Sequence, residues 1–258
     1  MSERADLQVF AVPGLPLVHA GDDLGAIITA ALRAHGPVPR DGDVIVVAQK
    51  IVSKAEDRYV DLRSVRPSAA AVELAAQTGK DPRIVEVILA ESVRVVRSRP
   101  GLLITEHRLG FVMANAGVDR SNIGAAGEGE RVLLLPRDPD ASAAALRARL
   151  MEEFGVELAV IVSDSFGRPW RVGTVGVAIG AAGLPTVVDL RGKPDLFGRP
   201  LEVTVIGYAD EIAAAASLLM GQADEARPVV LVRGLPKTQA PTLPAAAIVR
   251  PAAEDLFR

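Results

Sequence analysis

The sequence contains no cysteine, which excludes disulfide bonds, thiolate catalysis and cysteine-ligated zinc or iron–sulfur centres. Histidine is also scarce. His19, His35 and His107 lie far apart in the chain, and we interpret His35 and His107 as surface or structural residues. Any metal ion would therefore be held by oxygen ligands, which favours Mg²⁺ or Mn²⁺ over zinc. The lack of cysteine also fits a cytoplasmic protein.

An excess of positive charge and long hydrophobic runs are absent as well. The net charge of −3 leaves no general basic field for nucleic acid, so we expect no such partner. Residues 1–6 are polar and unlike a signal peptide, and charges interrupt every apolar run, so we expect no membrane span. With 258 residues, 49% of them hydrophobic, the chain can bury a sizeable core. We expect one domain over 1–258, with two lobes, 1–137 and 138–258, as the alternative.

The secondary-structure pattern favours a mixed α+β fold. Apolar segments bounded by Gly, Pro or Asp predict strands at 8–12, 43–48, 93–97, 102–105, 110–114, 131–135, 158–162, 186–190, 201–206 and 229–232. Apolar faces with a 3.6-residue period predict helices at 24–33, 68–78, 82–90, 141–154 and 211–220, the fourth ending at Gly155. Adjacent strand pairs interrupt the alternation, which indicates helices packed on mixed sheets rather than a regular βαβ winding. The recurring glycines at 173, 176, 180 and 183 match no dinucleotide fingerprint, and we interpret them as sites of close backbone packing.

Two polar stretches after predicted strands could carry chemistry. Residues 163–171, Ser-Asp-Ser-Phe-Gly-Arg-Pro-Trp-Arg, place an acid and a hydroxyl beside two arginines, which suits a hard metal ion next to a phosphate or carboxylate. A turn with solvated arginines and a tryptophan buried in the core is the alternative. In residues 115–122, Asp119 and Asn122 lie three apart, and local turn hydrogen bonding is the alternative there. Together the two stretches could supply two carboxylates to one divalent cation.

Two further segments suit a nucleotide. Lys50 and Lys54 follow the predicted strand 43–48 and would point the same way on a helical turn, as a polyphosphate requires. A solvated basic turn is the alternative. Residues 12–18, Val-Pro-Gly-Leu-Pro-Leu-Val, form a rigid extended segment whose backbone could contact a base or ribose, unless it is a simple strand exit. Residues 124–129 are glycine-rich but lack the lysine and hydroxyl residue of a P-loop.

These motifs resemble one family over residues 10–235. The segments 12–17, 50–56, 115–122, 163–171, 189–195, 197–198, 210–216 and 220–222 occur in the order found in the coenzyme F420-0:L-glutamate ligases, or γ-glutamyl ligases. The resemblance implies an unusual α+β fold, an intertwined homodimer and the form without a C-terminal flavin-reductase-like domain. It implies GTP-dependent addition of L-glutamate to the lactyl carboxylate of F420-0 through an acyl phosphate, then further γ-linked glutamates. The alternatives are a GTP-dependent amide ligase for another carboxylate and a non-catalytic nucleotide-binding module.

The resemblance also implies roles for individual residues. The metal ligands would be Asp119, Asp164, Ser165 and Gln222, holding Mg²⁺ or Mn²⁺, with K⁺ as a further candidate cation. The nucleotide contacts would be Leu15, Pro16, Leu17, Val18, Gln49, Lys50, Lys54 and Asn122. Arg168 and Arg171 would join the two aspartates in catalysis by clamping the F420-0 phosphate or the glutamate carboxylates. Asp57 stands where glycine is usual, which raises a question about the conformation of that turn.

Overall fold

The main sheet has five strands, and the predicted α+β class is confirmed. The computed structural model describes residues 6–123, 130–236 and 238–255. The order across the sheet is β1 (Gln8–Ala11), β12 (Val229–Arg233), β2 (Val44–Ala48), β8 (Ala159–Gly167) and β9 (Thr174–Ala182). Only β2 and β8 run parallel, and the other neighbouring pairs are antiparallel. The sheet draws strands from before and after position 137, so both predicted lobes contribute to it.

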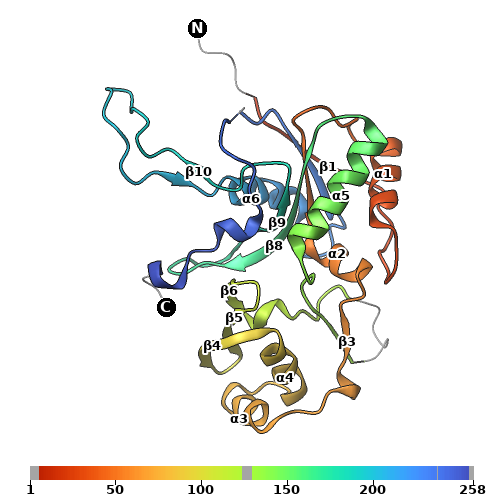
Figure 1. Ribbon diagram of the computed structural model, residues 1–258. Coiled ribbons are helices and arrows are strands. Elements are labelled where there is room, and N and C mark those ends of the chain that lie inside the picture. The colour runs from red at the N-terminus through yellow and green to blue at the C-terminus, as the bar shows by residue number, and fades with distance from the viewer. Residues whose placement is uncertain (1–5, 124–129, 237, 256–258) are drawn as a thin grey trace.

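Helices cover both faces of this sheet (Figure 1). One face packs against α1 (Leu24–His35) and α5 (Pro139–Phe154), and the other packs against α6 (Tyr208–Met220). The central strands are continuous apolar runs because both of their faces are buried. No helix within the described ranges is long and apolar enough to cross a membrane.

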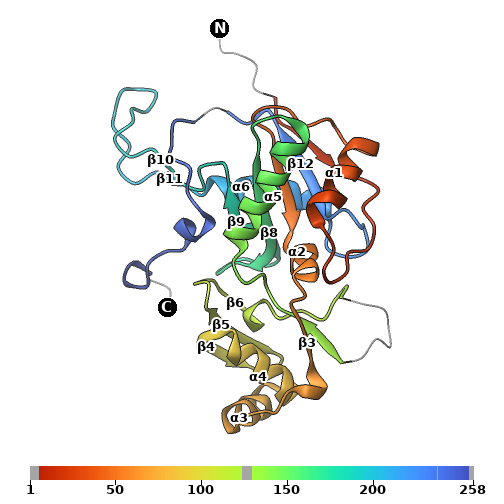
Figure 2. The same cartoon turned by 45° about the vertical axis from the view of Figure 1, so that its right-hand side comes forward.

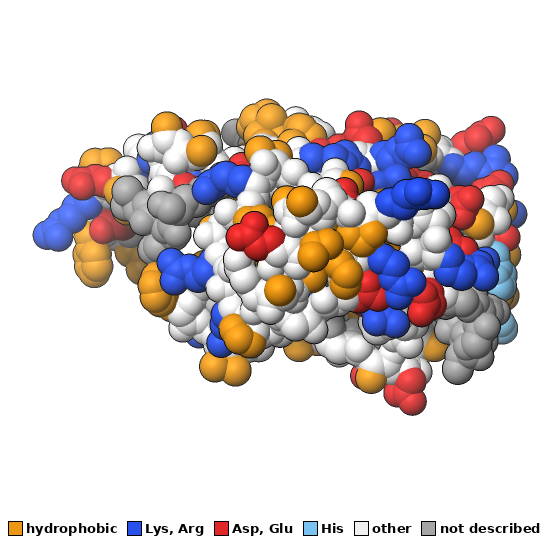
Figure 3. Space-filling model, turned by 90° about the horizontal axis from the view of Figure 1, so that it is seen from below, with side chains coloured by type: hydrophobic (Ala, Val, Ile, Leu, Met, Phe, Trp, Pro, Cys, Tyr) orange, Lys and Arg blue, Asp and Glu red, His pale blue; other side chains and the backbone are white. Residues whose placement is uncertain are grey.

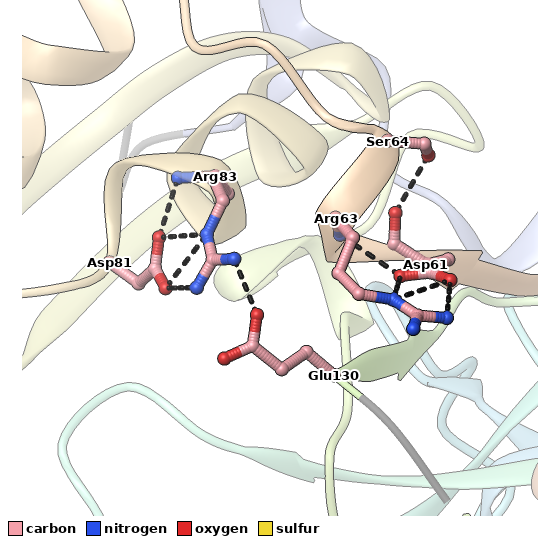
Figure 4. A network of polar contacts seen from close by, with 6 residues as sticks. All are labelled: Asp61, Arg63, Ser64, Asp81, Arg83 and Glu130. Carbon is pink, nitrogen blue, oxygen red and sulfur yellow. Dashed lines mark hydrogen bonds and ion pairs between the residues drawn. The ribbon is translucent and has the colours of Figure 1, made fainter.

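A smaller lobe lies below the main sheet in Figures 1 and 2, and it follows the short helix α2 (Gln49–Ala55). It contains two small antiparallel sheets and two helices. Its elements are β3 (Tyr59–Asp61), the 3₁₀ turn Leu62–Ser64, α3 (Ala69–Thr78), α4 (Pro82–Ala90), β4 (Ser92–Arg99), β5 (Leu102–His107), β6 (Val112–Ala114), the 3₁₀ turn Asn115–Gly117 and β7 (Arg131–Leu133). Ion pairs link residues on the surface of this lobe (Figure 4). Asp61 pairs with Arg63, and Arg83 pairs with both Asp81 and Glu130.

The sequence reading of β8 and β9 needs correction. No strand was predicted over β9, because glycine and alanine obscure its β pattern. The interpretation of glycines 176, 180 and 183 as close-packing sites agrees with the structure: a Cβ on Gly176 would lie 2.5 Å from the carbonyl oxygen of Ala213. The same interpretation of Gly173 is wrong, because a Cβ there would meet no atom within 4 Å, and its φ of +89° instead suits the turn before β9. Because β9 pairs with β8 as far as Gly167, Asp164 and Ser165 lie on a strand rather than in the loop expected after residue 162.

The segments predicted as strands at 186–190 and 201–206 are largely irregular. Only β10 (Val188–Asp189) and β11 (Val205–Ile206) pair, and they form the base of an exposed arm, residues 190–204. The arm projects from the body at the upper left of Figure 1. Beyond β12, the chain forms the 3₁₀ turns Ala245–Ile248 and Ala252–Glu254, and the first of these packs against the edge strand β9.

A partly buried ionic cluster ties the smaller lobe to the end of α2. The Glu91 Oε2 atom accepts from Arg58 Nη2 at 3.3 Å and Arg108 Nε at 3.2 Å, and it lies 3.4 Å from Nε2 of the buried His107. His107 Nδ1 accepts a hydrogen bond from the Leu109 amide, so Nε2 is the ring nitrogen that faces Glu91. The contact with His107 is the largest of the effects that hold the pKa of Glu91 at about 2, against opposing desolvation, with help from both arginines.

This cluster predicts a pH-dependent stability. A carboxyl whose pKa is lowered on folding stabilises the fold above its unfolded pKa, and the contribution disappears as the pH falls towards the folded value. Glu91→Gln should therefore lower the free energy of unfolding by about 3 kcal/mol at pH 7, and the difference from the original protein should shrink below about pH 4. Urea unfolding from pH 7 to pH 3 measures both values. Glu157→Gln, which breaks an ion pair with an exposed carboxylate, is the control; an equal loss in both variants would contradict the assignment.

Candidate active site

The candidate site lies where β2 ends and its parallel pairing with β8 stops. The last residue of β2, Ala48, pairs with Ser163, so Asp164 is the first residue of β8 beyond this parallel pair. A β-bulge between Val162 and Ser163 precedes it, and such bulges redirect side chains next to functional sites. Helix α2 begins directly after Ala48, which places Lys50 in its first turn at the same edge.

Asp119 approaches this edge from the smaller lobe. Its backbone forms an antiparallel bridge with Leu133 of β7, which fixes the loop after β6. Its Oδ2 atom lies 2.7 Å from Lys50 Nζ, and Oδ1 accepts from the amide and hydroxyl of Ser121 at 2.8 and 2.9 Å. Lys50 Nζ also donates to the carbonyl oxygen and hydroxyl of Ser121. Lys50, in the helix that follows β2 of the main sheet, thus anchors Asp119 of the smaller lobe.

The negative charge of Asp119 affects the pKa of Asp164. Burial raises the pKa of Asp164 to about 6; the amide of Ser165 and the charge of Lys50 oppose this rise, and the negative charge of Asp119 adds to it. Burial also acts to raise the pKa of Asp119, but hydrogen bonds from Lys50 and Ser121 outweigh it and leave that pKa below its usual value. Lys50 therefore pairs directly with Asp119 and acts on Asp164 only through its charge, so a further cation beside Asp164 would be favoured electrostatically.

The segment after α6 completes the cluster. Ser165 Oγ donates to Gln222 Oε1 at 2.9 Å, and Asn122 Nδ2 donates to the carbonyl oxygen of Ala223 at the same distance. The structure thus brings together Lys50, Asp119, Asn122, Asp164, Ser165 and Gln222 from four separate segments. The part of the chain that the structure describes contains no cluster of three or more His, Asp or Glu side chains suited to a metal. The donors fit Mg²⁺, which takes one or two carboxylates and completes its shell with water and substrate phosphates.

The residues expected to contact a nucleotide lie around α2. The loop after β1 reaches this helix, because the Gly21 amide donates to the carbonyl oxygen of Ala55 in its last turn. That turn also carries Lys54. Gln49 is buried, and its side-chain oxygen accepts from Ser53, so its amide group is engaged within the helix. Asp57 has a φ of +51°, the left-handed conformation that explains why glycine suits this turn.

Within the loop after β1, the predicted contact residues divide into two groups. Leu15 and Val18 pack towards the core, whereas Leu17 is 80% exposed and Pro16 is exposed. The loop therefore presents Pro16 and Leu17 outward from an anchored base. Their contact with a nucleotide stays a prediction.

The arginines predicted to bind substrate lie at the turn between β8 and β9. Arg168 is partly buried, and its Nη1 atom is shielded from solvent without a hydrogen-bond partner among the described residues. Arg171 is exposed at the surface of the same turn. Trp170 is 87% exposed, so the alternative in which the tryptophan fills the core is wrong. An unpaired guanidinium nitrogen is costly unless a ligand meets it, which favours a binding role for Arg168.

Two features of this region were not predicted from the sequence. Ser121 holds Asp119, and the spacing Asp-x-Ser of a polar turn was the available signal. Phe111 and Phe166 form an edge-to-face pair with ring centroids 5.7 Å apart. No local pattern links these rings, because they lie 55 positions apart on different elements.

Comparison with known proteins identifies the family. Residues 14–234 match the model of the F420-0:Gamma-glutamyl ligase family. Over 256 residues the chain is 47% identical to the coenzyme F420:L-glutamate ligase of Methanothermobacter thermautotrophicus, covering 98% of this chain and 99% of the relative. It is 48% identical to the ligase of that name from Methanopyrus kandleri, with 98% of each chain covered, and 40% identical to that from Methanocaldococcus jannaschii, with 100% and 99% covered. The chain therefore belongs to the F420-0:γ-glutamyl ligase family.

Proposed function

We propose that this protein is a GTP- and divalent-metal-dependent ligase that joins L-glutamate to the lactyl carboxylate of coenzyme F420-0. The reaction passes through an acyl phosphate, releases GDP and phosphate, and continues with γ-linked glutamates. The observation that carries the proposal is the ion pair of Lys50 with Asp119, beside Asp164 at the point where β8 leaves its pairing with β2. Relatives that cover nearly the whole chain are named as coenzyme F420:L-glutamate ligases, which supports the choice of substrates.

The chemistry needs an activated carboxylate, because a carboxylate does not condense with an amine in neutral water. Asp119 and Asp164, with Ser165 and Gln222 beside them, would hold Mg²⁺ or Mn²⁺, with K⁺ as a further candidate. Such an ion, when bound, neutralises negative charge on the phosphates during transfer. Lys50 and Lys54 add fixed positive charge on the α2 side, where the nucleotide phosphates would lie. Phosphoryl transfer relies on positioning and electrostatics, so the site needs no histidine or cysteine nucleophile.

We also propose that the functional unit is a homodimer in which the arm between β10 and β11 contacts a second copy. Leu196, Phe197 and Val203 on this arm are 99%, 88% and 84% exposed. The arm projects at the left of Figure 3, where hydrophobic and charged side chains gather at its tip. An extended arm exposing apolar side chains is typical of a segment that packs against a partner.

The deciding experiment is mass spectrometry of the products formed from F420-0, L-glutamate, GTP and Mn²⁺. Addition of one or more glutamyl units, with phosphate release that requires both acceptor and glutamate, would support the proposal. Turnover only with another carboxylate acceptor would favour a related amide ligase. Nucleotide binding without turnover would favour a non-catalytic module.

Lys54→Ala should weaken GTP binding more than acceptor binding. A hydrogen bond to a charged group contributes about 1.5–3 kcal/mol, so we expect a loss of about ten- to a hundredfold in GTP affinity. Isothermal titration calorimetry measures it, with Lys80→Ala in the smaller lobe as the control. Unchanged GTP affinity would assign Lys54 to the solvated surface of the helix.

Arg168→Lys and Arg171→Lys should each raise the KM for F420-0 or glutamate by about tenfold and leave GTP binding nearly intact. Lysine keeps the positive charge but lacks the planar two-point donor of arginine. Steady-state kinetics with each substrate varied in turn separates the effects. A selective loss of GTP affinity would assign that arginine to the nucleotide, and unchanged kinetics would remove it from the site.

A further inference from the structure

A second cavity lies beside the candidate site, at the free edge of β9. This cleft of about 220 Å³ is walled by Phe111, Phe166 and Val177, and the segment after β12 forms its other wall through Ile248 and Val249. The lining is mainly apolar and aromatic, and the C-terminal segment adds the charged residues Arg250 and Asp255. Asp210 of α6 supplies a carboxylate to the same cleft.

The wall formed by the C-terminal segment is firmly attached. Asp140 Oδ1 accepts from the Ala245 amide at 2.7 Å, and Ala245 is fully buried. Val249 packs on Gly110, where an added Cβ would lie only 2.9 Å from Val249 Cγ1. The cleft is therefore bounded by fixed elements on both sides, as expected of a preformed ligand site.

The strand register places this cleft next to Asp164. Val177 is the direct cross-strand partner of Asp164, and the Cβ atoms of such partners are about 5 Å apart. Phe166 lies two residues further along β8, about 7 Å from Asp164. Because β8 lies between β2 and β9, the cleft and the lysines of α2 approach Asp164 from opposite sides. The α2 side suits the nucleotide, which leaves the β9 side to the acceptor.

Of the three charged residues that line the cleft, Asp210, Arg250 and Asp255, the first favours a planar ring with an N–H donor. Asp210 Oδ1 accepts from the Ala178 amide at 2.9 Å, whereas Oδ2 accepts no hydrogen bond from the described residues. A half-buried carboxylate oxygen in an apolar cleft is a strong acceptor for a ligand N–H. The deazaflavin part of F420-0 is a flat heteroaromatic ring with an imide N–H, so its faces suit the apolar walls and its edge suits Asp210.

We propose that this cleft binds the deazaflavin ring of the acceptor, with Asp210 accepting a hydrogen bond from the ring N–H and Ile248 covering the ring. The proposal rests on the proposed function and names the subsite for one of its substrates. The lactyl carboxylate, at the other end of the flexible ribityl phosphate chain, would then reach the Asp164 side of the cleft.

The test uses the full chain and the deazaflavin–ribitol alcohol that lacks the phospholactyl group, whose fluorescence reports binding. Ile248→Gln and Asp210→Asn should each weaken binding of this alcohol about tenfold and raise the KM for F420-0 to a similar extent. The kcat and the KM for GTP and glutamate should stay unchanged. Ala247→Gln is the matched control, because Ala247 is the exposed neighbour of Ile248 on the same turn.

Unchanged affinity for the alcohol in a folded Ile248→Gln variant would overturn the proposal, even if Asp210→Asn fails to fold. A loss of GTP affinity instead of alcohol affinity would also overturn it and assign the cleft to the guanine base. Glutamyl transfer by the wild-type protein distinguishes failure of the proposed function from failure of the ring subsite. Absence of glutamyl transfer to F420-0 refutes the proposed function, whereas transfer with unaltered variant affinities refutes only the ring subsite.

Discussion

Asp164→Asn and Asp119→Asn are each expected to lower kcat for glutamate addition at least a hundredfold, while the protein stays folded. Each change keeps the size of the side chain but removes a negative charge from the pair that would hold the metal. The Asp119 change also deprives Lys50 of its 2.7 Å ionic partner. The rate is measured by phosphate release at saturating F420-0, glutamate and GTP over a range of Mn²⁺ concentrations.

Glu152→Gln provides the matched carboxylate-to-amide control, because Glu152 lies exposed on α5. Its turnover and Mn²⁺ dependence should equal those of the original protein. Circular dichroism establishes that all three variants are folded. Near-normal turnover in both aspartate variants, with the original metal dependence, would rule out the metal assignment.

Gly180→Ala should reduce the free energy of unfolding by about 2–3 kcal/mol, since an added methyl group has no space in the core. The new Cβ would lie 2.1 Å from the carbonyl oxygen of Pro139, in the first turn of α5. Backbone atoms at a helix start cannot move aside as a flexible side chain can, so α5 must shift away from β9. Urea denaturation gives the change in midpoint.

The control for this prediction is Gly167→Ala at the end of β8. A Cβ at that position would meet no atom within 4 Å, so stability should change little. If both alanine variants lose the same stability, the effect belongs to the general cost of replacing glycine rather than to the contact between β9 and α5.

Local patterns predicted the elements that depend on local interactions. Helix α4 has the predicted bounds, because Asp81 caps its first turn and Pro82 fits the first helical position. Gly155 ends α5 in the left-handed conformation, as its position suggested. The apolar strands β2 and β12 are also where their composition placed them.

The features of the fold and the site that the sequence did not predict depend on long-range contacts. The glycines of β9 allow α5 and α6 to pack closely against this strand. No alternation of apolar and polar residues in the sequence predicts the strand. The pairing of Lys50 with Asp119 joins two lobes across 69 positions of sequence. Each residue was singled out by its own motif, yet neither motif contains information about the other. The cleft beside β9 is harder still to predict from the sequence, because its lining residues come from five segments of the chain.

The carboxylate of Asp140 accepts hydrogen bonds from backbone amides in two parts of the chain that lie more than 60 positions apart. Ala181 of the edge strand donates to Oδ1 at 2.8 Å, and Ala245 of the C-terminal segment donates to the same atom. If either part separated, it would leave a partly dehydrated charge with too few donors, at a cost comparable to losing a charged hydrogen bond. Local opening of the edge strand and release of the C-terminal segment are therefore one cooperative event, so amide hydrogens in both parts share a single protection free energy.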